Sequence, residues 1–134
     1  MEVIREHQDT QHGSPDNFTG EVWIDAIAVS GGTSRLRANS VHFAPGARTA
    51  WHAHSNGQTL HVTEGIGRAQ ARGGPLREIR AGDTAVSAAG EWHWHGAAPR
   101  HFMTHVGMSD AGSGIGDTTW GEQVGDADYL ADAR

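Results

Sequence analysis

Residues 46–65 read GARTAWHAHSNGQTLHVTEG. Within this segment His52 and His54 alternate in a short run between glycines, as residues of one β-strand do. Side chains two apart in a strand share a face, with Cα atoms about 6.6 Å apart, so both imidazoles can converge on one ion. Gln58 opens the next expected strand. In a chain with ten histidines, one His-x-His pair alone does not establish a metal site.

Later segments contain histidines with the same alternation. His93 and His95 share one face of an expected strand, and His105 lies on the inward face of the last strand. Alternation also predicts a set of outward side chains, namely His42, His61, Trp51, Trp92 and Trp94. The inward histidines of these segments are therefore expected to meet in one interior.

Glycine separates the chain into short strand-like runs. The 19 glycines leave runs of about 5 to 9 residues that are rich in Val, Thr, Trp, Ile and Phe, a pattern typical of short antiparallel strands in a sandwich or barrel. We expect strands at 21–29, 36–43, 49–54, 58–63, 67–71, 76–80, 83–87, 92–96 and 101–108.

The length of 134 residues predicts a single domain, residues 1–134. The barrel is expected over about residues 20–109. A C-terminal loop and short helix are expected in 110–134, with the helix near 122–131.

Two patterns resemble the sequence motifs of the cupin family. The first is Gly46-x5-His52-x-His54-x3-Gln58-x6-Gly65, with Gln58 where that motif usually has Glu. The second is Gly82-x5-Ala88-x-Gly90-x2-His93, which departs from the motif at Ala88, usually Pro, and at Ala97, usually Asn. The resemblance implies an all-β fold, the cupin double-stranded β-helix or jelly-roll barrel. It also implies one metal ion with four ligands, His52, His54, Gln58 and His93.

Four segments are similar to the small manganese-dependent cupin hydroxynitrile lyases: 45–54 (PGARTAWHAH), 57–60 (GQTL), 93–99 (HWHGAAP) and 103–105 (MTH). Those enzymes cleave cyanohydrins to an aldehyde and hydrogen cyanide and run the reverse addition. The resemblance implies that His105 transfers the proton. His95 is either a second acid/base or a hydrogen-bonded interior residue without a catalytic part. The expected substrate pocket contains Asn39, Val41, Leu60, Gly107 and Ser109.

The expected ligands also indicate the chemistry of the ion. Three neutral imidazoles and a neutral amide leave the 2+ charge of a bound ion uncompensated, which favours Lewis-acid chemistry. The resemblance implies Mn(II), and the ligands also suit Fe(II), Co(II), Ni(II) and Zn(II). Two alternatives stay open: an iron-dependent dioxygenase-type cupin, and a cupin that binds a small ligand without catalysis.

Composition excludes several classes of function. The chain has no cysteine, and its ten basic residues are all arginine, so thiolate metal sites, cysteine nucleophiles and lysine Schiff bases cannot form. The net charge of −6 and the lack of a basic surface predict no nucleic-acid partner. No apolar stretch approaches the roughly 20 residues that cross a bilayer, so we expect no membrane association and a cytoplasmic location.

The outward tryptophans predict a covered surface. Trp51, Trp92 and Trp94 together would form an exposed apolar patch, which is uncommon on a monomer. We expect an N-terminal strand or a partner subunit to cover them, the latter in a homodimer or higher homo-oligomer. The other expected partner is a small molecule: a cyanohydrin, an aldehyde or cyanide.

Overall fold

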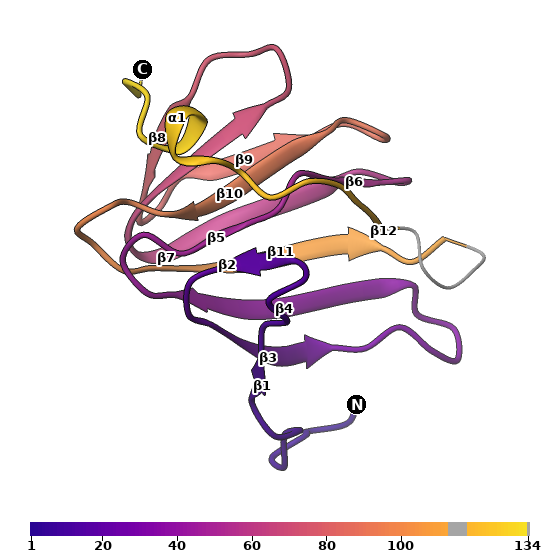
Figure 1. Cartoon of the computed structure of the whole chain (residues 1–134). Helices are drawn as coiled ribbons and strands as arrows, with labels where there is room; N and C mark the ends of the chain where they lie inside the picture. Colours follow the sequence, from indigo (N-terminus) through magenta and orange to yellow (C-terminus); the bar gives the residue numbers. More distant parts are fainter. Residues whose placement is uncertain (113–117, 134) are drawn as a thin grey trace.

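Short strands separated by turns curl into an antiparallel half-barrel (Figure 1). The computed structural model describes residues 1–112 and 118–133. Its elements are β1 (Gln11–His12), β2 (Phe18–Thr19), β3 (Val22–Ala28), β4 (Leu36–Phe43), β5 (Arg48–Thr49), β6 (His52–His54), β7 (Gln58–Ala71), β8 (Arg77–Arg80), β9 (Thr84–Ser87), β10 (His93–Ala97), β11 (Met103–Asp110), β12 (Thr118–Trp120) and α1 (Asp126–Tyr129). The expected all-β class is confirmed.

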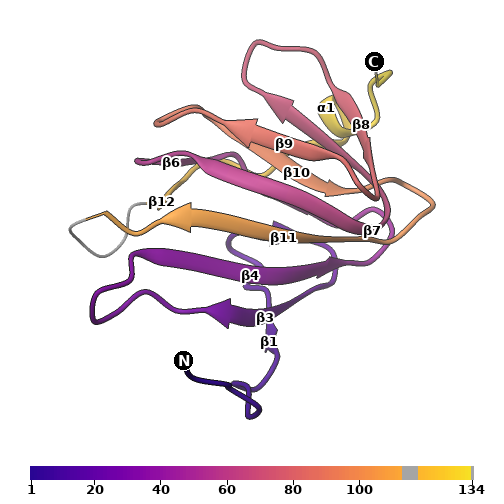
Figure 2. The same ribbon diagram turned by 180° about the vertical axis from the view of Figure 1, so that it is seen from behind.

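Two layers of strands face each other, and β7 belongs to both. One layer has the order β1-β3-β4-β11-β7-β9, which is visible from behind in Figure 2. The other layer contains β8, β10, β5 and β2, with β6 beside β10 and β12 beside β6. The first half of β7 pairs with β9 and β11, and its second half pairs with β8 and β10.

A glycine allows β7 to pass from one layer to the other. Gly65 has a positive φ of 80°, and a Cβ at this position would overlap the backbone of Phe102. Because glycine tolerates both the positive φ and the close approach of Phe102, strand β7 continues through Gly65 from one layer into the other. The sequence predicts two strands, 58–63 and 67–71, where the structure has this one continuous strand.

The apolar core lies between the two layers, toward one end of the strands. Its members are Val22, Phe43, Ala47, Val62, Ile79, Ala97 and Met103. They continue the alternation that brings the histidines inward, so the same strands bury apolar groups at one end and imidazoles at the other.

The C-terminal segment covers the outer face of the β6–β10 layer, where it runs beside β6 and β10 (Figure 1). Trp51 and Trp94 pack there with Val124 and Tyr129, and all four are buried. The expected cover by an N-terminal strand is therefore wrong for these two tryptophans. The composition of segment 121–133, with its many acidic residues, gave no signal for this packing, because only Val124 and Tyr129 carry it.

Hydrogen bonds fix the C-terminal segment to the barrel. The Arg48 guanidinium donates to the Val124 carbonyl at 2.7 Å and lies 4.3 Å from the centre of the Tyr129 ring. The Tyr129 hydroxyl donates to the Ala97 carbonyl at 2.6 Å. The C-terminal residues that make these contacts are mostly extended. Helix α1 is therefore a single turn, Asp126–Tyr129, and not the longer helix expected near 122–131.

Two further differences concern the termini. Strand β12 pairs with β6 and was not predicted, because Thr118–Trp120 follows a glycine-rich stretch. The expected loop from residue 110 extends into residues 113–117, which lie outside the described part of the chain. Among the described residues, no helix is long and apolar enough to span a membrane.

Candidate metal centre

Adjacent strands bring three imidazoles together in the barrel interior. His52 on β6 and His93 on β10 are cross-strand partners, and their ring centroids lie 4.3 Å apart. His95 follows two residues after His93 on the same face. One nitrogen from each of these three rings lies within 4.8 Å of the others, and all three rings are buried. We refer to His52, His93 and His95 as the histidine cluster.

Backbone carbonyls set the tautomers of two of these rings. His52 Nδ1 donates to the Ala50 carbonyl at 2.9 Å, and His93 Nδ1 donates to the Glu91 carbonyl at 2.9 Å. A carbonyl oxygen only accepts, so the proton lies on Nδ1 and each Nε2 keeps its lone pair. Metal-binding histidines use this arrangement, in which the second nitrogen fixes the ring.

Gln58 makes an unusual contact with the cluster. Its Oε1 atom lies 3.1 Å from His93 Nε2. With the His93 proton on Nδ1, both atoms are acceptors and repel each other unless a cation lies near them. Neighbouring ligands of one cation point their acceptor atoms at the same place, as Gln58 Oε1 and His93 Nε2 do. This contact therefore fits a metal ion bound between them.

His54 lies beside the cluster, held by the unpredicted strand β12. Its Nδ1 atom is 3.1 Å from the Thr118 hydroxyl oxygen, and its ring centroid is 5.1 Å from that of His52 and 5.7 Å from that of His93. The compact group of nitrogens thus contains His95 rather than His54. The expected ligand set of His52, His54, Gln58 and His93 stays a prediction.

His95 and His105 form a hydrogen-bonded pair across the two layers. His105 Nε2 and His95 Nδ1 lie 2.9 Å apart. The two outer nitrogens of the pair, His95 Nε2 and His105 Nδ1, are buried and have no hydrogen-bond partner among the described residues. A pair with one free nitrogen at each end can move a proton between its ends.

Burial keeps these histidines neutral. Desolvation, together with repulsion from His93, lowers the pKa of His52 to about 3. Desolvation lowers the pKa of His105 to about 4 and holds the pKa of His95 well below its usual value. The pKa of His93 is also lowered by burial. Neutral imidazoles are the form that binds a metal or accepts a proton.

An interior cavity of about 210 Å³ connects these groups. Four of the five expected pocket residues line it: Asn39, Val41, Gly107 and Ser109. His52, His54, Gln58, His95 and His105 also line it. Leu60 is buried and lines a neighbouring cavity of about 370 Å³ instead, together with His93. Leu60 thus lies behind Gly107, whose Cβ position would be 3.5 Å from Leu60 Cδ2.

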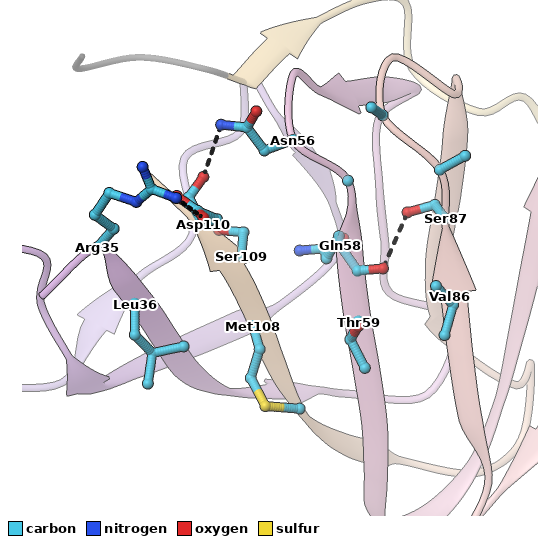
Figure 3. A pocket seen from close by; sticks show the side chains of 13 residues that line it. Arg35, Leu36, Asn56, Gln58, Thr59, Val86, Ser87, Met108, Ser109 and Asp110 are labelled. Atoms are coloured by element: carbon cyan, nitrogen blue, oxygen red, sulfur yellow. Dashed lines mark hydrogen bonds and ion pairs between the residues drawn. The ribbon is translucent and has the colours of Figure 1, made fainter. Parts of the chain in front are cut away.

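An outer cavity of about 490 Å³ shares lining residues with the interior one, and Figure 3 shows the side chains that line it. Gln58 and Ser109 line both cavities, so the two cavities lie next to each other. An ion pair between Arg35 and Asp110, 2.8 Å long, lies at its edge, and Asn56 donates to the Asp110 carbonyl at 3.2 Å. The outer cavity therefore adjoins the expected ligand Gln58.

Comparison with known proteins shows the family. The cupin-domain family model matches residues 39–101, which include Gln58 and the histidine cluster. An (R)-mandelonitrile lyase from Granulicella tundricola is 45% identical over 130 residues, covering 96% of this chain and 98% of that protein. The chain belongs to the cupin family.

Solved structures agree with the cupin fold. A cupin-like protein from Thermotoga maritima superposes with a TM-score of 0.84 at 38% sequence identity, covering 96% of this cupin and 95% of that chain. A cupin-2 domain protein from Rhodospirillum rubrum superposes with a TM-score of 0.71 at 15% identity, covering 91% of this cupin and 78% of that chain. The second likeness concerns the fold alone.

Sequence reasoning missed several residues of the cupin interior. Arg37, Thr118 and Trp120 line the cavity but were not predicted to do so. Arg37 has the same parity in β4 as Asn39 and Val41, so alternation extended by two residues finds it. Thr118 and Trp120 come from β12, where no sequence signal marked a strand.

Proposed function

We propose that this cupin is a metal-dependent hydroxynitrile lyase, which cleaves cyanohydrins to an aldehyde and hydrogen cyanide and catalyses the reverse addition. The observation that carries the proposal is that His52, His54 and Gln58 line one cavity together with the hydrogen-bonded His95–His105 pair. The likeness to a protein named (R)-mandelonitrile lyase supports the same reaction class.

In this proposal His52, His54, Gln58 and His93 hold one divalent ion, Mn(II), although Fe(II), Co(II), Ni(II) and Zn(II) suit the same donors. When bound, the ion supplies Lewis-acid polarisation of an oxygen or nitrile group. Because none of the four side chains is anionic, they do not reduce the charge that the substrate meets. The buried surroundings exclude water from this polar contact.

His105 manages the proton of the reaction. Its Nδ1 atom accepts the hydroxyl proton of the cyanohydrin while the electrons of the O–H bond form the carbonyl and the C–C bond breaks. The C–C bonding pair leaves with cyanide, which takes the proton from protonated His105 and departs as hydrogen cyanide, so that the imidazole is neutral again. His95 positions His105 through the 2.9 Å hydrogen bond, in which His105 Nε2–H donates and leaves Nδ1 free to accept.

The experiment that tests the proposed function is enantioselective addition. Metal-loaded protein with benzaldehyde and excess cyanide, at mildly acidic pH, is expected to form mandelonitrile with one enantiomer in excess, measured by chiral chromatography. Metal-stripped protein is the matched control. Racemic product at the blank rate would contradict the lyase. Oxygen consumption by the iron-loaded protein would then favour a dioxygenase, and ligand binding without turnover would favour a binding cupin.

A further inference from the structure

Four glycines lie inside the strands that the structure describes, and three of them have no room for a side chain. A Cβ at Gly65, Gly67 or Gly96 would come within 2.5 Å of a backbone oxygen. Gly107 on β11 differs, because its φ is not positive and the nearest atoms would lie 3.5 Å from a Cβ, an ordinary contact distance. Neither the backbone conformation nor the packing therefore requires glycine at position 107.

The missing side chain of Gly107 leaves a space beside the candidate centre. A Cβ there would lie 3.5 Å from each of three atoms, which are Gln58 Nε2, His105 Cε1 and Leu60 Cδ2. Gly107 lines the interior cavity of about 210 Å³ together with Gln58 and His105. We refer to the space that a methyl group on Gly107 would fill as the Gly107 gap. A glycine inside a strand weakens it and often marks a place where a ligand approaches closely, and the gap is such a place.

The Gly107 gap lies close to the nitrogen of His105 that lacks a partner. His105 Nδ1 is buried and has no hydrogen-bond partner among the described residues. It is bonded to Cε1, the ring atom of His105 that lies nearest the gap. The other ring nitrogen, Nε2, is held by His95 at 2.9 Å. A substrate hydroxyl that donates to Nδ1 therefore brings its own carbon next to the gap.

The surroundings of the Gly107 gap favour a small apolar group. Leu60, which supplies one of the three nearest atoms, is 4% exposed and is the cross-strand neighbour of Gly107 on β7. A hydrogen atom on the reacting carbon would leave the gap unfilled and lose these contacts. A group larger than methyl would overlap atoms that already lie at contact distance from the Cβ position. One methyl group therefore matches the gap in size and polarity.

We propose that the Gly107 gap receives a methyl substituent on the reacting carbon, so that this cupin accepts cyanohydrins of methyl ketones as well as those of aldehydes. The inference rests on the proposed lyase function for the reaction, though not for the binding. Cleavage balances as it does for an aldehyde. The O–H bond and the C–C bond to cyanide break, the C=O bond of the ketone forms, and cyanide departs with the proton as hydrogen cyanide.

The kinetic test compares mandelonitrile with acetophenone cyanohydrin, which carries one more methyl group on the reacting carbon. Gly107→Ala fills the gap with a methyl group of the protein. It should lower kcat/KM for acetophenone cyanohydrin roughly tenfold more than kcat/KM for mandelonitrile, because two methyl groups then compete for one space. Gly31→Ala is the matched control, since Gly31 is exposed and no described atom lies within 4 Å of its Cβ position. This control should keep the native ratio of the two values.

Binding of unreactive alcohols separates the inference from the lyase assignment. Benzyl alcohol and 1-phenylethanol differ by the same methyl group, and their binding needs neither turnover nor a bound metal. In NMR titrations of the metal-free protein, the native cupin should bind the tighter enantiomer of 1-phenylethanol about fourfold more tightly than benzyl alcohol, the effect of one buried methyl group. Gly107→Ala should abolish this preference, and Gly31→Ala should keep it.

The two measurements together distinguish failure of the inference from failure of the lyase function. Loss of the alcohol preference in Gly107→Ala, without conversion of either cyanohydrin by the native protein, upholds the methyl site and contradicts the lyase. A folded Gly107→Ala protein that keeps both the native alcohol preference and the native ratio of kcat/KM values overturns the inference and leaves the lyase intact. A native protein that binds both alcohols equally, or that cleaves mandelonitrile alone, also overturns the inference.

Discussion

At the residue scale, backbone carbonyls orient the His52 and His93 rings so that the Nε2 lone pair of each ring can bind a metal ion. Each ring donates Nδ1–H to a carbonyl two residues earlier, Ala50 or Glu91. Each histidine is the first residue of its strand, so the carbonyl two residues earlier lies just outside that strand. The lone pair on Nε2 is thereby fixed by local structure rather than by long-range packing.

The buried histidines predict that acid destabilises the metal-free protein. Their folded-state pKa values are lowered, to about 3 for His52 and about 4 for His105, so below pH 6.5 the unfolded chain binds protons that the folded chain does not. Stability is therefore fully present above pH 6.5, falls as pH drops, and stops falling below about pH 3. Urea unfolding at pH 7 and pH 5 is expected to show a loss on the order of 2 kcal/mol per such histidine.

The variant His105→Asn removes one of these buried imidazoles and should reduce the difference between the two pH values. An unfolding midpoint that is the same at pH 7 and pH 5 would contradict neutral burial of these rings.

Alternation within strands accounts for the site residues that were found from the sequence. The inward placement of His52, His93, His95 and His105 follows directly from a period of two. The partner of each ring does not follow, because the His95–His105 bond joins two layers whose register depends on packing. Leu60 also has inward parity, yet it lines the neighbouring cavity instead, beside Gly107.

At the element scale, the C-terminal segment covers the outer face of strand β10. Tyr129→Ala should destabilise the cupin by about 3 kcal/mol or more, because it removes a buried ring and the hydroxyl bond to Ala97. The neighbouring Leu130→Ala is the control, since Leu130 is 58% exposed and should change stability by less than about 0.5 kcal/mol. Urea unfolding followed by tryptophan emission from Trp94 and Trp51 measures both.

Equal unfolding midpoints for the two variants would show that the segment does not pack as described.

The elements that sequence analysis placed well are those with strong alternation and clear turns. Strand β4 matches its expected range, 36–43, because it alternates and ends before Pro45-Gly46. The C-terminal segment was expected to be helical from its composition, whereas its conformation depends on Arg48, which binds the Val124 carbonyl from 76 residues away. Contacts at that separation leave no local pattern.

At the scale of the whole molecule, the prediction of a homodimer stays, but on a different surface. Trp51 and Trp94 are already buried within the chain, whereas Trp23 and Ile27 on β3, Leu36 on β4 and Val86 on β9 are exposed. An exposed set of large apolar side chains on one layer is typical of an association surface. Sedimentation is expected to give twice the 14.3 kDa chain mass, and Trp23→Glu is expected to shift the species toward the monomer.

A single 14.3 kDa species at micromolar concentration would contradict the dimer.

The central claim is that four residues bind the metal while His105 transfers the proton. The variant His105→Ala tests it most directly. Benzaldehyde release from mandelonitrile and the metal content are measured on the same sample. His105 lines the cavity but is not among the expected ligands, so the variant should keep the metal content of the native cupin. It should lose roughly a hundredfold or more in rate, the usual contribution of a positioned acid/base. A fully loaded His105→Ala protein that is as fast as the native one would contradict the assignment and place the proton carrier elsewhere.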